Sequence, residues 1–324
     1  MSHTARALFY VAPGVAEIRP VTLDLPVGET VLVRTLATAI SRGTERLVAS
    51  GGVPESEHSR MRAPFQTGDF PFPVKYGYAA VGVVEEGPEA LLGQRVFSLY
   101  PHQTHFRVPL SAALPVPASV PTARACLAAN METALNALWD GSVMPGSRVL
   151  VLGAGLVGCL IAALIGRRAD VDLVVCDILP HRNSLLADFN VTFMTPDALV
   201  GEFQKVFHAS ASQAGLQLAL DCCAFEGEVI ELSWYGANPV AVQLGGAFHA
   251  KRLTLRASQV GHVAPAKRAT TSHRDRLAAA LVALEDPRLD AFLTDSVSFE
   301  DLPAAIPGLL APGAAGIATV INYE

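Results

Sequence analysis

Charged residues are few in this chain, and no stretch of it is strongly basic. Only 17% of its 324 residues are Asp, Glu, Lys or Arg, and the formal net charge is -6. Proteins that bind nucleic acid neutralise its phosphates with clustered Lys and Arg, so we expect no nucleic-acid partner. The hydrophobic share of 51% indicates instead a well-packed globular protein, long enough for two compact domains.

Cysteine is scarce and lacks the spacing of a metal site. None of the five cysteines forms a C-x-x-C pair, and no Cys/His cluster has zinc-finger spacing. Cysteines scattered in apolar surroundings are small core residues as a rule. The adjacent Cys222 and Cys223 could form a redox pair, although neighbouring thiols rarely reach disulfide geometry.

Long hydrophobic runs are missing as well. The most apolar segment, Val149–Ile165, is interrupted by three glycines and is too short to span a bilayer. The N-terminal residues lack the apolar core of a signal peptide. We therefore expect a cytoplasmic protein with no membrane partner, and we find no internal repeat or low-complexity tract.

The N-terminal part of the chain is rich in β-strand patterns. Short β-branched runs such as Thr30–Arg34 and Ala80–Glu85 alternate with Gly and Pro residues, which predicts a β-rich domain over residues 1–125. The pattern then changes, because Ala123–Asp140 carries alanines and leucines at helical spacing.

Strands and helices alternate in the middle of the chain. The predicted strands are Val149–Leu152, Val171–Asp177, Val206–Ala209, Glu228–Trp234 and Arg252–Val260. The predicted helices between them are Gly155–Arg167, His181–Phe189 and Ala214–Ala224. This alternation builds a parallel sheet with helices on both faces, so the predicted fold class is α/β with a doubly wound Rossmann sheet over residues 126–263. A long helix, Ser272–Leu284, a short helix near Leu302–Leu310 and a closing strand, Gly316–Asn322, follow it.

The strongest local pattern is a glycine fingerprint, G-x-G-x-x-G, at Gly153, Gly155 and Gly158. It stands between a predicted strand and a predicted helix. In that context the first glycine allows a tight turn, the second lets a pyrophosphate approach the backbone, and the third lets helix and strand pack closely. The helix N-terminus offers amide donors to the phosphates, so the pattern predicts a dinucleotide site.

Asp177 ends the next predicted strand, about twenty residues after the fingerprint. A carboxylate at this place accepts hydrogen bonds from the adenosine ribose and repels a 2′-phosphate, which favours NAD over NADP. Arg182 follows closely and could contact the adenine or compensate a 2′-phosphate, so NADP stays open as the cofactor.

Four further segments resemble motifs of the medium-chain dehydrogenase/reductase superfamily, which includes the alcohol dehydrogenases. Ala37–Glu45 resembles its C-G-T-D region, Tyr76–Val84 its G-H-E-x-x-G-x-V segment, Gly93–Val96 its G-D-R-V motif, and Ala129–Ala137 the lead into the Rossmann strand. The resemblance implies a GroES-like catalytic domain over residues 1–125, completed by residues 264–324, and a Rossmann NAD-binding domain over residues 126–263. It also implies a small-molecule substrate and a homodimer.

The departures from the family pattern concern its catalytic zinc. Zinc-dependent members place Cys, His and Cys ligands where this chain has Arg42 (or Ser41), Tyr78 and about Ala129. Arg and Ala do not coordinate zinc. The four-cysteine lobe of many relatives is absent from the sequence too. We therefore expect no metal, and another group has to polarise the substrate or supply a proton.

The resemblance, and for His249 its place after a predicted parallel strand, suggest five candidates for that catalytic role, and each has a structural alternative. Tyr78 is the first candidate, but it could equally pack in the core. Thr44 matches the family's relay hydroxyl and Glu45 the acidic residue beside it, yet both could be turn residues that cap a helix. Glu132 could be a carboxylate with a raised pKa or an ordinary helix-surface residue, and His249 could titrate or be structural.

The expected cofactor contacts combine the fingerprint with positions taken from the resemblance. Thr133 matches a family threonine near the nicotinamide, and Trp234 and Tyr235, which follow a predicted strand, could line an aromatic pocket. The full set is Gly153, Gly155, Leu156, Val157, Gly158, Asp177, Arg182, Thr133, Ser210, Trp234, Tyr235 and Gln259.

The leading hypothesis is an NAD(P)-dependent oxidoreductase that interconverts an alcohol and a carbonyl without catalytic zinc, on a cyclic or aromatic substrate. One alternative is the reduction of an activated C=C or C=N bond, which needs no metal. Another is a non-catalytic nucleotide-binding protein. The polar residues retained around the expected cleft argue against this last alternative.

Overall fold

The computed structural model describes residues 4–23 and 28–323 and divides the chain into two compact units. The first unit comprises Met1–Ala129 and Leu281–Glu324, and the second comprises Asn130–Ala280. Within the described ranges, no helix is both long and apolar enough to cross a membrane.

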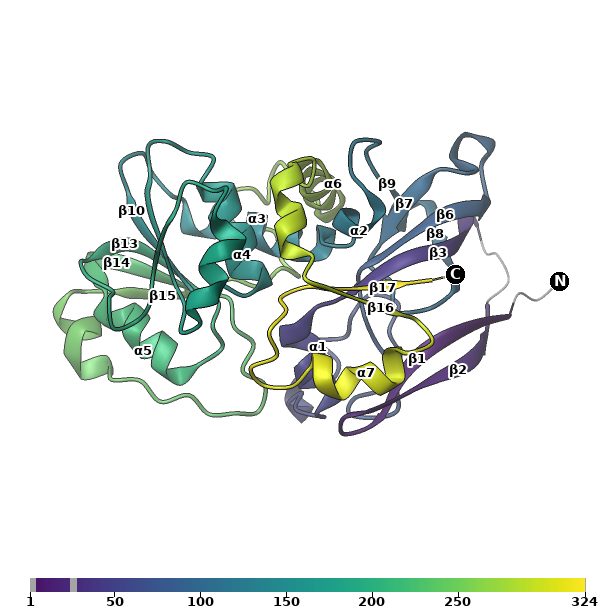
Figure 1. Ribbon diagram of the computed structural model, residues 1–324, viewed down its shortest axis with the longest axis horizontal. Helices are drawn as coiled ribbons and strands as arrows, with labels where there is room; N and C mark the ends of the chain where they lie inside the picture. Colours follow the sequence, from purple (N-terminus) through teal and green to yellow (C-terminus); the bar gives the residue numbers. More distant parts are fainter. Residues whose placement is uncertain (1–3, 24–27, 324) are drawn as a thin grey trace. The chain divides into compact units, whose positions relative to one another are not determined.

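The second unit contains a six-stranded sheet in which all neighbouring strands are parallel (Figure 1). Its strands are β10 (Arg148–Leu152), β11 (Asp172–Cys176), β12 (Thr192–Met194), β13 (Phe203–His208), β14 (Cys223–Glu231) and β15 (Thr254–Ala257). Their spatial order is β12-β11-β10-β13-β14-β15. Numbered within the unit, this is 3-2-1-4-5-6, the order of a Rossmann fold. The predicted fold class is confirmed.

Helices precede, connect and follow the strands of this sheet. They are α3 (Ala128–Gly141), α4 (Leu156–Ile165), α5 (Gln213–Asp221) and α6 (His273–Ala283), with a 3-10 helix at Pro180–Leu186 and a π-helix at Leu244–Phe248. Because crossovers are right-handed and the strand order reverses beside β10, α4 and α5 cover opposite faces. Ligands bind at such a reversal, beyond the carboxyl ends of the strands.

Two predicted helices differ from the structure. The segment His181–Phe189 forms a 3-10 helix from Pro180 to Leu186, in which the Ser184 hydroxyl donates to the His181 carbonyl. Such local side-chain bonds compete with an α-helix. The helix expected over Ala123–Asp140 is divided into α2 (Thr122–Ala125) and α3, and Arg124 of α2 donates to the Asp290 carboxylate.

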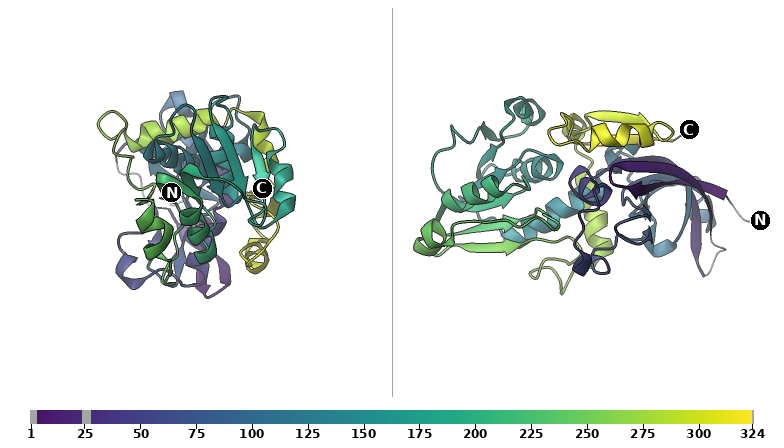
Figure 2. Two further views of the ribbon diagram at one scale, coloured as in Figure 1. Left: turned by 90° about the vertical axis from the view of Figure 1, so that its left-hand side faces the viewer. Right: turned by 90° about the horizontal axis from the view of Figure 1, so that it is seen from below.

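The first unit is built from two β-sheets. A seven-stranded sheet contains β3 (Thr30–Ile40), β6 (Ala80–Glu86), β7 (Arg95–Ser98), β8 (His105–Pro109), β9 (Leu114–Pro115), β16 (Asp295–Ser298) and β17 (Thr319–Asn322). A four-stranded sheet contains β1 (Thr4–Ala12), β2 (Val15–Thr22), β4 (Thr67–Gly68) and β5 (Val74–Lys75). Figure 2 shows β1 and β2 as a long hairpin. The last strand, β17, pairs antiparallel with β3, so the C-terminal segment returns to this unit.

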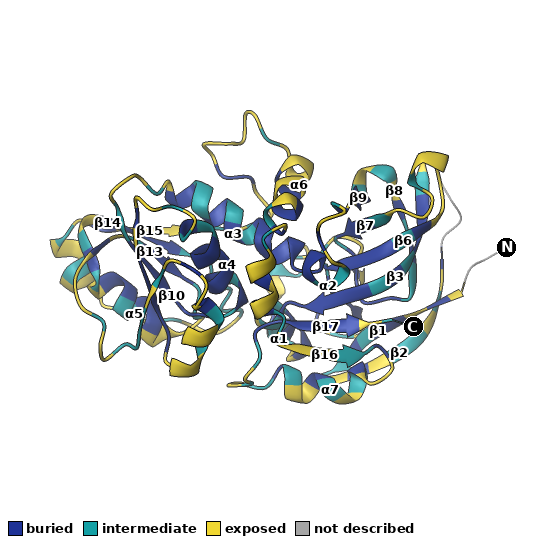
Figure 3. Ribbon diagram, turned by 45° about the horizontal axis from the view of Figure 1, so that its top comes forward, coloured by how far each residue is buried: buried dark blue, intermediate teal, exposed yellow. Residues whose placement is uncertain are grey.

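Each unit has its own apolar core. In the second unit, Leu216, Ala219 and Leu220 of α5 pack onto buried residues of the parallel strands. The central strands β10 and β13 are accordingly buried in Figure 3, whereas every residue of the edge strand β15 is exposed. All five cysteines are free, and four of them are buried, as expected of small core residues. Burial raises the pKa of the Cys159 thiol to about 12.

Candidate functional site

The glycine fingerprint forms the turn between β10 and α4, and each glycine has a different surrounding. A Cβ on Gly158 would lie 1.9 Å from the Gly153 carbonyl oxygen, and a Cβ on Gly153, whose φ is 106°, would lie 2.8 Å from the Ser210 amide nitrogen. These two positions therefore require glycine for packing and for the turn. A Cβ on Gly155 would meet no atom within 4 Å. The space beside Gly155 is open, as a site for a pyrophosphate requires, and Leu156 and Val157 begin α4 directly after it.

Asp177 follows β11 and lies beside this turn. Its Oδ2 accepts from the Ala154 amide at 2.6 Å and from Arg182 Nη1 at 3.0 Å, and its Oδ1 accepts from the Leu179 amide at 2.9 Å. The residue is 7% exposed. The carboxylate thus shapes the glycine turn itself and keeps only part of its acceptor capacity for a ribose.

Arg182 forms an ion pair with Asp177, and its side chain is 16% exposed. Within the described part of the chain, its Nε is a buried donor with no hydrogen-bond partner. Ile178, between these two residues in sequence, is 77% exposed and is thus an apolar side chain open to solvent at the carboxyl end of β11. This end of β11 therefore combines a hydrogen-bond acceptor (Asp177), a donor without a partner (Nε of Arg182) and an exposed apolar side chain (Ile178).

A second polar group lies at the carboxyl ends of β13 and β14. The Nδ1 of His208 lies 2.7 Å from Glu231 Oε2, and its Nε2 lies 2.7 Å from the Ser210 hydroxyl. The Tyr235 hydroxyl donates to Glu231 Oε2 at 3.1 Å, and the Ser233 amide donates to Oε1 at 2.7 Å. Burial acts to raise the pKa of Glu231, but the bonds from His208 and Ser233 hold it below its ordinary value.

Sequence reasoning placed Ser210 and Tyr235 at the cofactor but missed His208 and Glu231. These two residues are register partners in the parallel pair β13–β14. A polar residue at the end of each of two consecutive apolar strands was the signal that could have found them, because parallel strands bring their carboxyl ends to one edge. This edge of the sheet therefore holds a buried, hydrogen-bonded His208–Glu231 pair, with the hydroxyl groups of Ser210 and Tyr235 on either side.

Glu132 lies on α3 and is paired inside the second unit. It is 4% exposed, and its Oε1 accepts from Arg276 Nε at 2.9 Å. Arg276 is 1% exposed and also donates to Asn136 and to the carbonyls of Val260 and His262. Burial raises the pKa of Glu132 above its ordinary value, although Arg276 acts in the opposite direction.

Two further residues of α3, on the same helix face as Glu132, make hydrogen bonds with the segment that follows β15. Asn136 Oδ1 accepts from the Ala264 amide at 3.0 Å, and Asp140 Oδ2 accepts from the Ser258 hydroxyl at 2.7 Å. Glu132, Asn136 and Asp140 are spaced by four residues and therefore lie on one face of the helix. This polar stripe, together with Arg276, fixes residues 258–264 at the carboxyl end of β15.

Replacing Arg276 with methionine should destabilise the second unit strongly. Glu132 would remain buried without its counter-charge, which costs about 3–5 kcal/mol. For a unit of this size we expect a fall of about 6–20 °C in Tm, measured by calorimetry. The double variant Arg276→Met/Glu132→Leu should recover much of the loss, because no charge is left buried. A single variant as stable as the parent protein would contradict the ion pair.

The remaining predicted residues of this unit differ in how far they are exposed. Thr133 and Trp234 are half-buried, whereas His249 and Gln259 are exposed. Trp234 follows β14, and His249 follows the π-helix.

In the first unit, Tyr78 forms a polar group with the start of α1 (Arg42–Ala49). Its hydroxyl makes hydrogen bonds with the side chains of Ser41 and Thr44. Ser41 stands at the N-cap position but makes no side-chain bond to the helix. Burial raises the pKa of Tyr78 to about 12, although these two hydrogen bonds act to lower it. The phenol therefore stays protonated at neutral pH and is a hydrogen-bond donor.

Glu45 lies one turn further along α1 and is fully buried, with both of its oxygens bonded. Oε1 accepts from the Ser41 amide at 2.8 Å, and Oε2 accepts from the Tyr10 hydroxyl at 2.8 Å. The Nε2 of His102, also fully buried, lies 3.0 Å from Oε2, and Nδ1 of the same ring lies 2.7 Å from Thr38 Oγ1. Glu45 thus fixes the backbone at Ser41, which in turn is bonded to Tyr78.

The residues at the positions that resemble the zinc ligands of the dehydrogenases have other partners or lack a ligand side chain. Arg42 donates to the Ala314 carbonyl, Tyr78 is bonded to two hydroxyl groups, and Ala129 has no ligand atom. Across the described residues, no group of three or more His, Cys, Asp or Glu side chains is placed to hold a metal ion. This donor set does not fit zinc.

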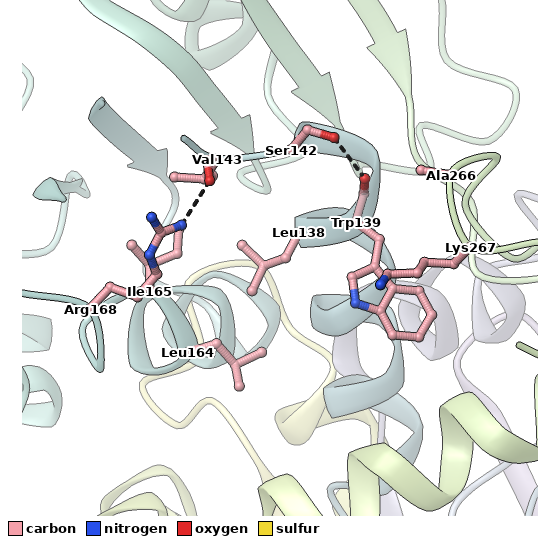
Figure 4. A pocket seen from close by; sticks show the side chains of 9 residues that line it. All are labelled: Leu138, Trp139, Ser142, Val143, Leu164, Ile165, Arg168, Ala266 and Lys267. Carbon is pink, nitrogen blue, oxygen red and sulfur yellow. Dashed lines mark hydrogen bonds between the residues drawn. The ribbon is translucent and has the colours of Figure 1, made fainter. Parts of the chain in front are cut away.

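A cavity of about 260 Å³ lies elsewhere in the second unit, at the C-terminal ends of α3 and α4 (Figure 4). It is lined by Leu138, Trp139, Ser142, Val143, Leu164, Ile165, Arg168, Ala266 and Lys267. Because α4 begins at the glycine turn, its C-terminal end is at the opposite edge of the sheet. None of the predicted site residues lines this cavity.

Comparison with solved structures identifies the fold. No family model matches the chain. L-idonate 5-dehydrogenase from Escherichia coli superposes with a TM-score of 0.80 at 16% identity, over 99% of both chains. A putative zinc-binding dehydrogenase from Sinorhizobium meliloti bound to NADP gives 0.77 at 16%, also over 99% of both chains. An alcohol dehydrogenase from Escherichia coli complexed with NADH gives 0.77 at 15%, over 98% of this chain and 99% of that chain. The chain therefore has the fold of the alcohol dehydrogenase-like proteins, a Rossmann unit with a GroES-like β-rich unit.

Proposed function

We propose that this chain is an NAD(P)-linked oxidoreductase of the medium-chain dehydrogenase/reductase type. The observation that carries the proposal is the glycine turn at the end of the first strand of the parallel sheet, with open space beside Gly155. Free amides of the first turn of α4 meet that space, and a pyrophosphate binds in such a place. The similar structures that hold NADH and NADP support the proposal.

The nicotinamide cofactor, when bound, would donate or accept the hydride. We place its pyrophosphate at residues 153–158 and its adenosine ribose at Asp177, with the exposed Ile178 beside the adenine. The carboxylate of Asp177 favours NAD, whereas the unsatisfied Nε of Arg182 offers a donor to the 2′-phosphate of NADP. We therefore propose NAD as the cofactor, with NADP accepted.

We propose further that the reaction needs no zinc and that Tyr78 acts on the substrate oxygen. Its phenol stays protonated at neutral pH and can donate a hydrogen bond to a carbonyl. Ser41 and Thr44 hold the hydroxyl, and Glu45 positions Ser41. Trp234 and Tyr235, half-buried at the carboxyl ends of the parallel strands, support a cyclic or aromatic substrate.

Replacing Tyr78 with phenylalanine should lower kcat by about 100- to 1,000-fold, the effect of removing one hydrogen bond to a developing oxyanion. KM should change little, because the bond strengthens in the transition state. The assay follows NADH oxidation with cyclic and aromatic ketones in the presence of a metal chelator.

Three outcomes of this assay distinguish the hypotheses. Chelator-resistant reduction of ketones supports the proposal. Activity that disappears on chelation and returns with zinc contradicts it. Reduction of enones or imines without reduction of ketones replaces alcohol/carbonyl chemistry with the reduction of an activated double bond.

We propose that the protein is a homodimer that pairs through β15. This strand is the open edge of the parallel sheet, all four of its residues are exposed, and Leu255 is 40% exposed. An open edge of this kind is ready to pair with a second strand.

Leu255→Glu should raise the dimer dissociation constant by about 10- to 100-fold in sedimentation experiments. The control Leu92→Glu changes a residue of the first unit that is 48% exposed and should have no effect; a monomeric parent protein would refute the proposal.

A further inference from the structure

We propose that Ser210 is an activated nucleophile that accepts acyl groups from small activated esters. Its hydroxyl lies 2.7 Å from His208 Nε2, and His208 Nδ1 lies 2.7 Å from Glu231 Oε2. These are the contacts of a nucleophile with a base, and of that base with an orienting carboxylate. The hydride transfer proposed above uses neither His208 nor Glu231.

The hydrogen bonds around His208 select its reactive tautomer. Glu231 is ionised, because its bonds from His208 and Ser233 lower its pKa although burial opposes them. A carboxylate only accepts, so Nδ1 of His208 donates to it and Nε2 is left to accept from the Ser210 hydroxyl. The Ser212 hydroxyl, 2.9 Å from the Ser210 hydroxyl, accepts from the Gly215 amide and can donate its own proton to Ser210.

The backbone places Ser210 on a sharp turn from strand to helix. Ala211, directly after it, has a φ of 51°, and Ser212 is the N-cap of the nine-residue helix α5. The first-turn amides of Gln213 and Ala214 have no partner within the helix and are candidate donors to an oxyanion. A Cβ on Gly215 would lie 2.2 Å from the Ser210 hydroxyl, so only glycine lets α5 approach this closely.

The chemistry balances with water as the only co-reactant. The Ser210 oxygen bonds to the acyl carbon while His208 Nε2 takes the hydroxyl proton, and the same proton then passes to the departing alcohol or phenol. Water, deprotonated by His208, attacks the acyl-serine, and the proton returns to Ser210 as the acid leaves. The overall change is ester hydrolysis, with no oxidation.

Two probes test the proposal on the full-length protein without nicotinamide cofactor. We expect a fluorophosphonate to label Ser210, located by peptide mass spectrometry, and p-nitrophenyl acetate to be hydrolysed. Ser210→Ala should abolish both reactions, and His208→Gln should slow both by at least about 100-fold. Ser119→Ala is the control, because the Ser119 hydroxyl bonds the Glu285 carboxylate directly and not a histidine; this variant should behave as the parent protein does.

Glu231 acts through His208 and is a positioning residue. Glu231→Gln should lower kcat for p-nitrophenyl acetate at least about tenfold while KM changes less than about twofold, because Glu231 does not contact the ester. The proposal is overturned if the parent protein is not labelled at Ser210, or if His208→Gln is labelled as fast as the parent. Neither result depends on cofactor binding, so the oxidoreductase proposal succeeds or fails separately.

Discussion

Replacing Gly155 with valine is expected to weaken NADH binding by about 10- to 100-fold and to leave the protein as stable as before. The reason is that a Cβ at this position meets no atom within 4 Å in the protein alone. If the cofactor pyrophosphate fills that space, the added side chain collides with the ligand, whereas its Cβ has no protein atom within 4 Å. Fluorescence titration with NADH, together with Tm by calorimetry, measures both effects.

The neighbouring Gly158 provides the matched control. A Cβ there would lie 1.9 Å from the Gly153 carbonyl oxygen, so Gly158→Ala should distort the turn and lower Tm as well as affinity. The two variants therefore separate a glycine needed by the ligand from one needed by the fold. If Gly155→Val binds NADH as the parent protein does, the pyrophosphate does not lie beside Gly155.

Replacing Asp177 and Arg182 in turn should change the preference between NADH and NADPH in opposite directions. Asp177→Ser leaves the Arg182 guanidinium without its ion-pair partner, free to bind a 2′-phosphate. Arg182→Met leaves the carboxylate uncompensated, so it repels that phosphate and binds ribose hydroxyls. A charge-assisted hydrogen bond contributes about 1.5–3 kcal/mol, so the ratio of the two dissociation constants should change by about 10- to 150-fold each way.

Titration of each variant with both cofactors measures these ratios. Asp177 also accepts from the Ala154 and Leu179 amides, so Asp177→Ser should weaken both cofactors in addition to shifting the preference. Because this loss affects both cofactors equally, it cancels in the ratio of the NADH and NADPH dissociation constants. If both variants change the preference between NADH and NADPH in the same direction, Asp177 and Arg182 do not contact the adenosine ribose.

Local patterns were enough to predict the glycine turn and the parallel sheet. The turn depends on Gly153, Gly155 and Gly158, which are close in sequence, and strand–helix alternation determines the sheet. The helix predicted over His181–Phe189 forms as a 3-10 helix over Pro180–Leu186, and apolar spacing did not show its type or its earlier end.

The partners of the polar residues could not be predicted in the same way. Glu132 was a candidate carboxylate, but its partner Arg276 lies 144 residues further along the chain. His208 and Glu231 meet only because β13 and β14 pair in one particular register. A single sequence shows which residues can ionise, but not which distant side chain neutralises each of them. That partner decides whether a buried charged residue takes part in a reaction or only stabilises the fold.

The measurement that tests the central claim most directly is a titration of the purified, metal-analysed protein with NADH, followed by nicotinamide fluorescence. We expect saturable binding at one site per chain without stoichiometric zinc, and much weaker binding in Gly155→Val. Absence of binding to both NADH and NADPH would contradict the assignment as an NAD(P)-linked oxidoreductase. Stoichiometric zinc would contradict the zinc-free site at Tyr78.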